Sequence, residues 1–156
     1  MTTTTTSQSR PTRADAATHL WTGAGLTAFA AVLLPRLNAV LHQDQRIWQL
    51  DQEATVLVPV IVLTTVALFA FLGRWAWRGP DNRPARVSLI CGVVALVGIL
   101  AFWLSAPIIF GGLALTLGVE GLRRAGDQQH RGLAVAGAVL GALGVLAGAA
   151  VWIANV

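Results

Sequence analysis

The sequence from Gly132 to Ile153, "GLAVAGAVLGALGVLAGAAVWI", decides the fold class. It contains no charged side chain, and small residues recur throughout an apolar background. A helix needs about 20 consecutive apolar residues to cross the hydrocarbon core of a bilayer. We therefore predict that this segment is a transmembrane helix.

The whole chain has the composition of a multi-span membrane protein. Of its 156 residues, 55% are hydrophobic and only 12% are charged, whereas a soluble domain has about 25% charged residues. The formal net charge is +4, and all 11 basic residues are arginines. These arginines lie in short segments beside apolar runs, so we expect association with a membrane and not with nucleic acid.

Four further apolar segments precede Gly132–Ile153 in the chain. They run from Leu20 to Leu34, from Thr55 to Trp77, from Val87 to Leu104 and from Ile108 to Leu122. The pattern predicts an all-α polytopic membrane helical bundle with about five transmembrane helices. The third and fourth segments are short for a hydrocarbon core of about 30 Å. Four spans plus a re-entrant or interfacial pair is therefore the alternative.

Three regions follow from this pattern. Residues 1–18 are polar and threonine-rich, which predicts a disordered cytoplasmic tail. Residues 19–84 hold the first two membrane helices, with Pro35 expected at the end of the first. Leu37–Glu53 is predicted to form an external amphipathic connector on the membrane surface. Residues 85–156 form the predicted glycine-rich three-helix domain. No convincing cleavage site follows the first span, so we expect it to be retained.

The arginines and tryptophans predict the topology. With five spans, one side of the membrane holds Arg10, Arg13, Arg74, Arg78, Arg83, Arg86, Arg123, Arg124 and Arg131, and the other side holds Arg36 and Arg46. Cytoplasmic loops are enriched in basic residues. We therefore predict a multi-pass protein of the inner or plasma membrane, with a cytoplasmic N-terminus and an extracytoplasmic C-terminus. Each of the tryptophans lies near a predicted span end, where this residue is favoured.

Small residues at helical spacing predict where the helices pack. Glycine, alanine and serine let membrane helices approach closely. The predicted packing residues are Gly92 and Gly98 on the third span, Ala114 and Gly118 on the fourth, and Gly137, Gly141, Gly144 and Gly148 on the fifth. We expect this glycine zipper to pack the last three spans within the chain in preference to dimerisation.

The same half of the chain resembles a known family. Between Ala85 and Ile153 it contains "ARVSLICGVVALVG", "GGLALTLGVEGLRRAGD" and "HRGLAVAGAVLGALGVL". This order resembles a bacterial, actinobacterial-type domain-of-unknown-function family of small glycine-rich integral membrane proteins. The resemblance implies an integral membrane segment without an assigned activity. Some relatives carry an extracytoplasmic or kinase-like domain, which we do not expect in this chain.

No catalytic or metal site can be assembled from the sequence. No Asp, Glu, Lys, Arg or His lies near the middle of a predicted span, where such groups mark transport or catalytic sites. The acidic and histidine side chains of the connector lack metal-ligand spacing; they are His42, Asp44, Asp51 and Glu53. Gly23–Ala28 imitates a dinucleotide fingerprint without the required βαβ unit. We therefore predict no enzyme activity, no cofactor and no metal.

Glu120 lies in the last turn of the predicted fourth span. Arg123 and Arg124 follow three and four residues later, on the same helical face. Arginine also suits a helix C-terminus because of the helix dipole. We predict an interfacial ion pair of Glu120 with Arg123 and Arg124, and not a proton-carrying site.

These features predict a non-enzymatic small integral membrane protein, an accessory or scaffold component of the bacterial cell envelope. Its expected partners are the lipid bilayer, and other membrane proteins or a second copy; nucleic acid is not expected. A component of a small-solute or ion transporter or channel is the alternative. The number of spans and the breaks at Pro35 and Pro107 suggest it.

Overall fold

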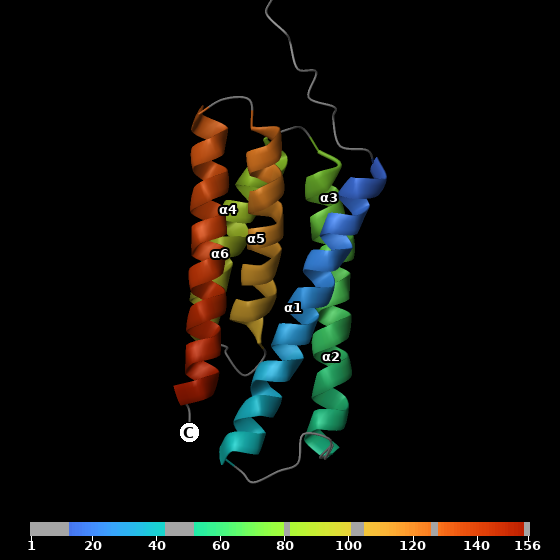
Figure 1. Ribbon diagram of the computed structural model, residues 1–156, viewed down its shortest axis with the longest axis vertical. Coiled ribbons are helices and arrows are strands. Elements are labelled where there is room, and N and C mark those ends of the chain that lie inside the picture. Colours follow the sequence, from blue (N-terminus) through green and yellow to red (C-terminus); the bar gives the residue numbers. More distant parts are fainter. Residues whose placement is uncertain (1–12, 43–51, 80–81, 101–104, 126–127, 155–156) are drawn as a thin grey trace, which may run out of the picture.

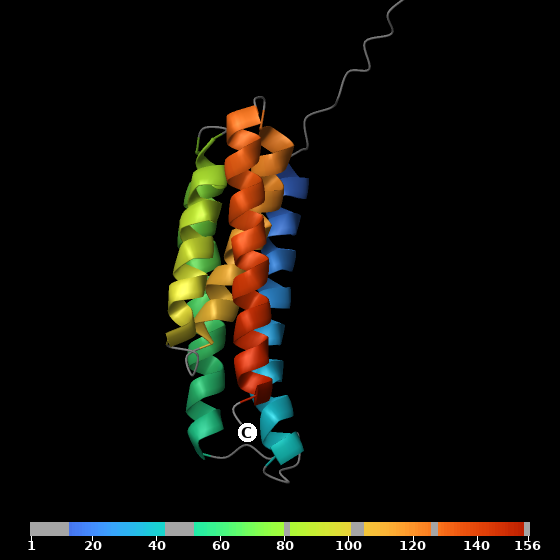
Figure 2. The ribbon, with the colours of Figure 1, turned by 90° about the vertical axis from the view of Figure 1, so that its left-hand side faces the viewer.

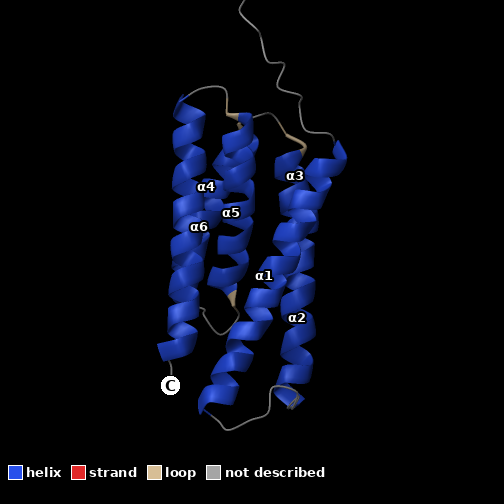
Figure 3. Ribbon diagram, in the orientation of Figure 1, coloured by secondary structure: helices blue, strands red, loops and turns tan. Residues whose placement is uncertain are grey.

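The computed structural model describes residues 13–42, 52–79, 82–100, 105–125 and 128–154. The elements in chain order are α1 (Arg13–His42), α2 (Gln52–Leu68), the π-helix η1 (Phe69–Gly73), α3 (Arg74–Trp77), α4 (Arg83–Val97), α5 (Ala106–Arg124) and α6 (Gln128–Ala154). In the described parts all regular structure is helical (Figure 3).

Five helical stretches are long and apolar enough to cross a membrane. They are Ala17–Val40, Thr55–Trp77, Arg83–Leu100, Ala106–Arg124 and His130–Ala154, and the second combines α2, η1 and α3. The predicted all-α bundle of about five membrane helices is therefore confirmed. The third and fourth stretches have lengths of about 27 and 28 Å at 1.5 Å per residue, close to the thickness of the hydrocarbon core.

The helix α5 lies at the centre of the bundle. It packs against α4 and α6 on one side and against α1 on the other, and it is the most buried of the five stretches. Figures 1 and 2 show the long helices running side by side, with α2 at the edge next to α1. Phe69, Leu113 and Leu117 are fully buried in the apolar core between η1 and α5.

The first helix is longer at both ends than the sequence predicted. It begins at Arg13, so the last residues of the predicted disordered tail are helical. Alanines between Arg13 and Thr18 explain this start, because alanine has the highest helix propensity. The helix also continues through Pro35 to His42. The prediction that Pro35 ends the span was wrong, since membrane helices tolerate an internal proline when neighbouring groups satisfy the freed carbonyl.

The predicted amphipathic connector, Leu37–Glu53, is not one separate helix. Its first residues belong to α1 and its last two belong to α2. The interval 43–51, which includes Asp44, Arg46 and Trp48, lies outside the described residues. The apolar spacing in Leu37–His42 reflects continuation of the membrane helix, because one helix can extend beyond the hydrocarbon core at a tilt.

The basic segments gather at one end of the bundle. In Figure 1 the start of α1, the end of α3, the start of α4, the end of α5 and the start of α6 lie together at the top. We call this the arginine end; it contains Arg74, Arg78, Arg83, Arg86, Arg123, Arg124 and Arg131. Successive spans run in opposite directions, so the helix ends and starts that carry these arginines meet at the same end of the bundle.

The turn before α5 is fixed inside the bundle by Ser105. Its backbone is left-handed, with φ of 54°, a conformation that costs energy for a residue with a side chain. The Ser105 carbonyl accepts hydrogen bonds from the backbone N–H groups of Ile108 and Ile109, each at 3.1 Å. Its buried hydroxyl donates to the carbonyl of Ala31 on α1 at 3.2 Å. The predicted break at Pro107 is thus preceded by a turn that is anchored to another helix.

A reciprocal pair of glycine–threonine contacts joins α1 to α5. Gly23 on α1 lies against the side chain of Thr116, and Gly112 on α5 lies against the side chain of Thr27. Both helices carry a glycine four residues before a threonine, and they run in opposite directions, so each threonine covers the other helix's glycine. A Cβ at Gly112 would stand 2.7 Å from Cγ2 of Thr27, closer than real contacts allow.

We expect Gly23→Leu to destabilise the protein by about 1–3 kcal/mol, because the new side chain overlaps Thr116 and forces α1 away from α5. Gly25→Leu is the matched control, since nothing lies within 4 Å of a Cβ at Gly25. Thermal unfolding followed by circular dichroism in a mild detergent measures both. Equal melting temperatures for the two variants would contradict the contact.

Candidate functional site: the glycine seam and its charged end

The closest approaches to the backbone of a neighbouring helix occur where α6 crosses α4 and α5. A Cβ added to Gly137 would lie 2.6 Å from the backbone nitrogen of Leu89 on α4. A Cβ added to Gly141 would lie 2.8 Å from the carbonyl oxygen of Gly111 on α5. Real Cβ atoms do not approach backbone atoms this closely, so only glycine permits the observed separation. We call this set of contacts the glycine seam.

The facing helices contribute the matching small residues. A Cβ at Gly92 would lie 2.8 Å from Cβ of Leu140, and one at Gly118 would lie 2.8 Å from Cβ of Ala138. Ala114 is fully buried and contacts Gly141. The structure therefore brings these predicted packing residues of all three helices into one seam.

Toward the far end of α6 the nearest atoms are side-chain atoms, and the contact is looser at Gly148 than at Gly144. A Cβ at Gly144 would lie 2.7 Å from Cβ of Ala95, and one at Gly148 would lie 3.0 Å from Cβ of Pro107. Gly98 differs from the rest of the predicted set. It is the residue that caps the end of α4, and an added Cβ there would be 3.5 Å from Cβ of Ala106, an ordinary contact. Close packing therefore does not require glycine at residue 98.

Sequence reasoning missed three members of the seam. Gly111 faces α6, where an added Cβ would lie 2.6 Å from the carbonyl oxygen of Gly141. Gly121 meets the backbone of Ala85 on α4. Ser88 is fully buried, and its hydroxyl donates a 2.7 Å hydrogen bond to the carbonyl of Ala114. A signal was present, because residues 111, 114, 118 and 121 are small and repeat on one helical face.

The seam ends at a charged cluster between α5 and α3. Nε of Arg124 donates to Oε1 of Glu120 at 2.6 Å, and the Glu120 side chain is only 4% exposed. Nη1 of Arg124 donates to the carbonyl of Trp77 at 2.7 Å, and its guanidinium lies 5.4 Å from the centre of that indole ring. Arg123 is exposed and forms no ion pair with Glu120. Of the predicted trio, the structure pairs Glu120 with Arg124 alone.

The other buried polar side chains are engaged in helix structure. Thr65 is fully buried and bonds to the carbonyl of Ile61 one turn earlier, at 2.8 Å, while Thr64 faces outward. The thiol of Cys91 is free and buried. Gly23–Ala28 lies within the membrane helix α1. Among the residues whose placement is described, no group of three His, Cys, Asp or Glu lies together as a metal site would need.

We expect Gly137→Ala to lower the free energy of unfolding by about 1–3 kcal/mol, because the methyl group must displace the α4 backbone. The matched control is Gly132→Ala on the same helix, where a Cβ meets nothing within 4 Å. The control should be neutral or slightly stabilising, since alanine has the higher helix propensity. Titration with sodium dodecyl sulfate gives both values. A neutral Gly137→Ala variant would refute the seam as a close contact.

We expect Arg124→Ala to destabilise the protein by about 1–3 kcal/mol, because it leaves the buried Glu120 carboxylate and the Trp77 carbonyl without their donor. Arg123→Ala removes the same charge from an exposed position and should change stability by less than about 0.5 kcal/mol. The two variants are compared by the fraction of protein that stays monodisperse after heating. Similar losses for both variants would show that the cluster is not a structural tie.

Comparison of the chain with protein-family models, with curated proteins and with solved structures finds no match. The family resemblance described above therefore stays a prediction. What the protein does has to be argued from the glycine seam, the charged cluster and the surfaces of the bundle.

Proposed function

We propose that this chain is a non-enzymatic accessory or scaffold protein of the bacterial cell envelope. The observation that supports this is that its buried polar groups bond to other groups within the bundle. Ser88 and Ser105 each bond to the backbone of another helix, and Glu120 is held by Arg124. The two serine bonds, and the bond from Arg124 to the Trp77 carbonyl, fasten helices to one another. A protein whose buried polar groups hold its helices together is suited to keeping a fixed shape in the membrane.

The outward faces offer apolar surface to lipid and to other membrane proteins. Leu63 on α2 and Leu146 on α6 are 67% and 65% exposed. The helices α1 and α2 are the least buried of the five stretches, so much of their surface is available to a partner. We propose the bilayer, other membrane proteins or a second copy as the partners, and not nucleic acid.

The proposed location is the inner or plasma membrane, with the arginine end in the cytoplasm. Basic residues favour the cytoplasmic side of a membrane protein, and the first, third and fifth spans all begin at the arginine end (Figure 1). This orientation places the N-terminus inside and the C-terminus outside. It also agrees with membership of the actinobacterial-type family of glycine-rich membrane proteins, which we propose from the resemblance.

Site-specific photo-crosslinking in intact cells tests the scaffold role. A crosslinking amino acid at Leu63 or Leu146 should yield a discrete protein adduct, because each side chain faces out of the bundle. The same amino acid at Leu117, which is fully buried, is the control and should yield none. Mild-detergent purification should recover the same partner or a homo-oligomer.

Two results would contradict the proposal. One is a monomer under every purification condition, with only lipid adducts from both outward positions. The other is a selective flux of ions or small solutes through liposomes that contain the purified protein. That flux would favour the transporter or channel alternative, and buried-packing variants such as Gly137→Ala would then alter it.

A further inference from the structure

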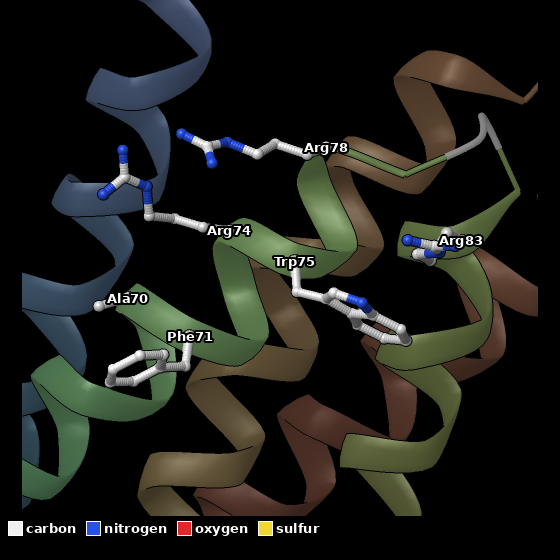
Figure 4. A pocket seen from close by; sticks show the side chains of 6 residues that line it. All are labelled: Ala70, Phe71, Arg74, Trp75, Arg78 and Arg83. Carbon is white, nitrogen blue, oxygen red and sulfur yellow. The ribbon is translucent and has the colours of Figure 1, made fainter.

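An open pocket of about 340 Å³ lies on the outer face of the arginine end. It forms where the second span ends and α4 begins, and it is lined by Ala70, Phe71, Arg74, Trp75, Arg78 and Arg83 (Figure 4). None of these residues belongs to the glycine seam or to the charged cluster around Glu120. The scaffold role does not depend on this pocket, so it is a separate feature of the molecule.

The upper part of the pocket is strongly basic. Arg74 and Arg78 are exposed and lie one helical turn apart, and Figure 4 shows their side chains extending in the same direction. Among the side chains that the structure describes, the single carboxylate is that of Glu120, which is bound to Arg124. Asp81 of the adjoining loop lies outside the described residues. Adjacent guanidinium groups of this kind suit an anionic, multi-oxygen group such as a phosphate.

Arg83 is held in place over the ring of Trp75. Its guanidinium carbon lies 4.5 Å from the ring centre, within the range of a cation–π contact. The side chain passes over Gly79, where an added Cβ would overlap it. In Figure 4 Arg83 lies across Trp75 from the guanidinium groups of Arg74 and Arg78, so it bounds the other side of the pocket.

The lower part of the pocket is apolar and exposed. Phe71 is 78% exposed and Trp75 is 54% exposed, and they are one turn apart on the outer face. Phe71 lies within η1, and π-helical segments often occur at functional sites. Both side chains belong to the second membrane stretch, Thr55–Trp77. Phe71 therefore places aromatic surface deeper in the membrane than Arg74 and Arg78, and Trp75 lies at the level of these arginines.

We propose that this pocket binds an anionic glycerophospholipid. Arg74 and Arg78 contact the phosphate headgroup, Arg83 stays stacked on Trp75, and Phe71 and Trp75 contact the first part of an acyl chain. Phe71 lies deeper in the span than the two arginines, as the acyl chain of a lipid lies deeper than its phosphate. Basic pockets at the membrane surface select anionic headgroups. A zwitterionic lipid is disfavoured because its quaternary ammonium would approach the same arginines.

Native mass spectrometry of the full chain in a mild detergent tests the site with dioleoyl phosphatidylglycerol and dioleoyl phosphatidylcholine. The wild-type protein should retain phosphatidylglycerol in preference to phosphatidylcholine. The double variant Arg74→Gln/Arg78→Gln should weaken phosphatidylglycerol binding by at least about tenfold. The matched control Arg86→Gln/Arg123→Gln removes the same charge from exposed positions of the arginine end outside the pocket. It should stay within about twofold of the wild type.

A second variant and a soluble competitor identify the source of the phosphate. Phe71→Ala should weaken phosphatidylglycerol binding without changing the thermal unfolding of the chain, because the side chain is exposed. Glycerol 3-phosphate at the lipid concentration should not displace the lipid, since it lacks the acyl chain. Equal binding losses in the two double variants would overturn the proposal by showing a general surface charge effect. Displacement by glycerol 3-phosphate would overturn it in favour of a soluble phosphate compound.

Discussion

The rest of the bundle depends on how closely the α6 backbone approaches α4 and α5. In hydrocarbon, apolar side chains gain little by leaving lipid, so helices associate through close van der Waals contact and cross-helix hydrogen bonds. Gly137 and Gly141 make that contact possible on α6, and the hydrogen bond from Ser88 to Ala114 joins α4 to α5. Because α5 also contacts α1, the position of the peripheral helices follows from this seam.

The architecture could be predicted from the sequence because the thickness of a bilayer determines the length of an apolar run. The ends of the helices were less predictable. Pro35 interrupts the apolar pattern, but neighbouring helices decide whether a proline ends a membrane helix, and α1 continues past it. By helical spacing alone, Gly98 and Gly118 are both predicted to be packing residues. Only the three-dimensional arrangement shows that Gly118 meets another helix closely and Gly98 does not.

Contacts between helices that are distant in the sequence could not be predicted, and the reason is related. The glycine–threonine spacing of α1 and α5 can be read from the chain, but its meaning requires knowing that the two helices are antiparallel neighbours. The charged end of α5 illustrates the same limit. Arg123 and Arg124 are equally plausible partners of Glu120 by spacing. Arg124 alone lies on the side of α5 that reaches the Trp77 carbonyl, and this third group decides between them.

The position of the seam has a consequence for how the protein is made. The helices leave the ribosome in chain order, so α4 and α5 emerge before α6. Until then the glycine faces of both helices, including Gly92 and Gly118, are uncovered and resemble the unfilled contact surface of an incomplete assembly. The arrival of α6 is therefore the step that completes the packing of these three helices during synthesis.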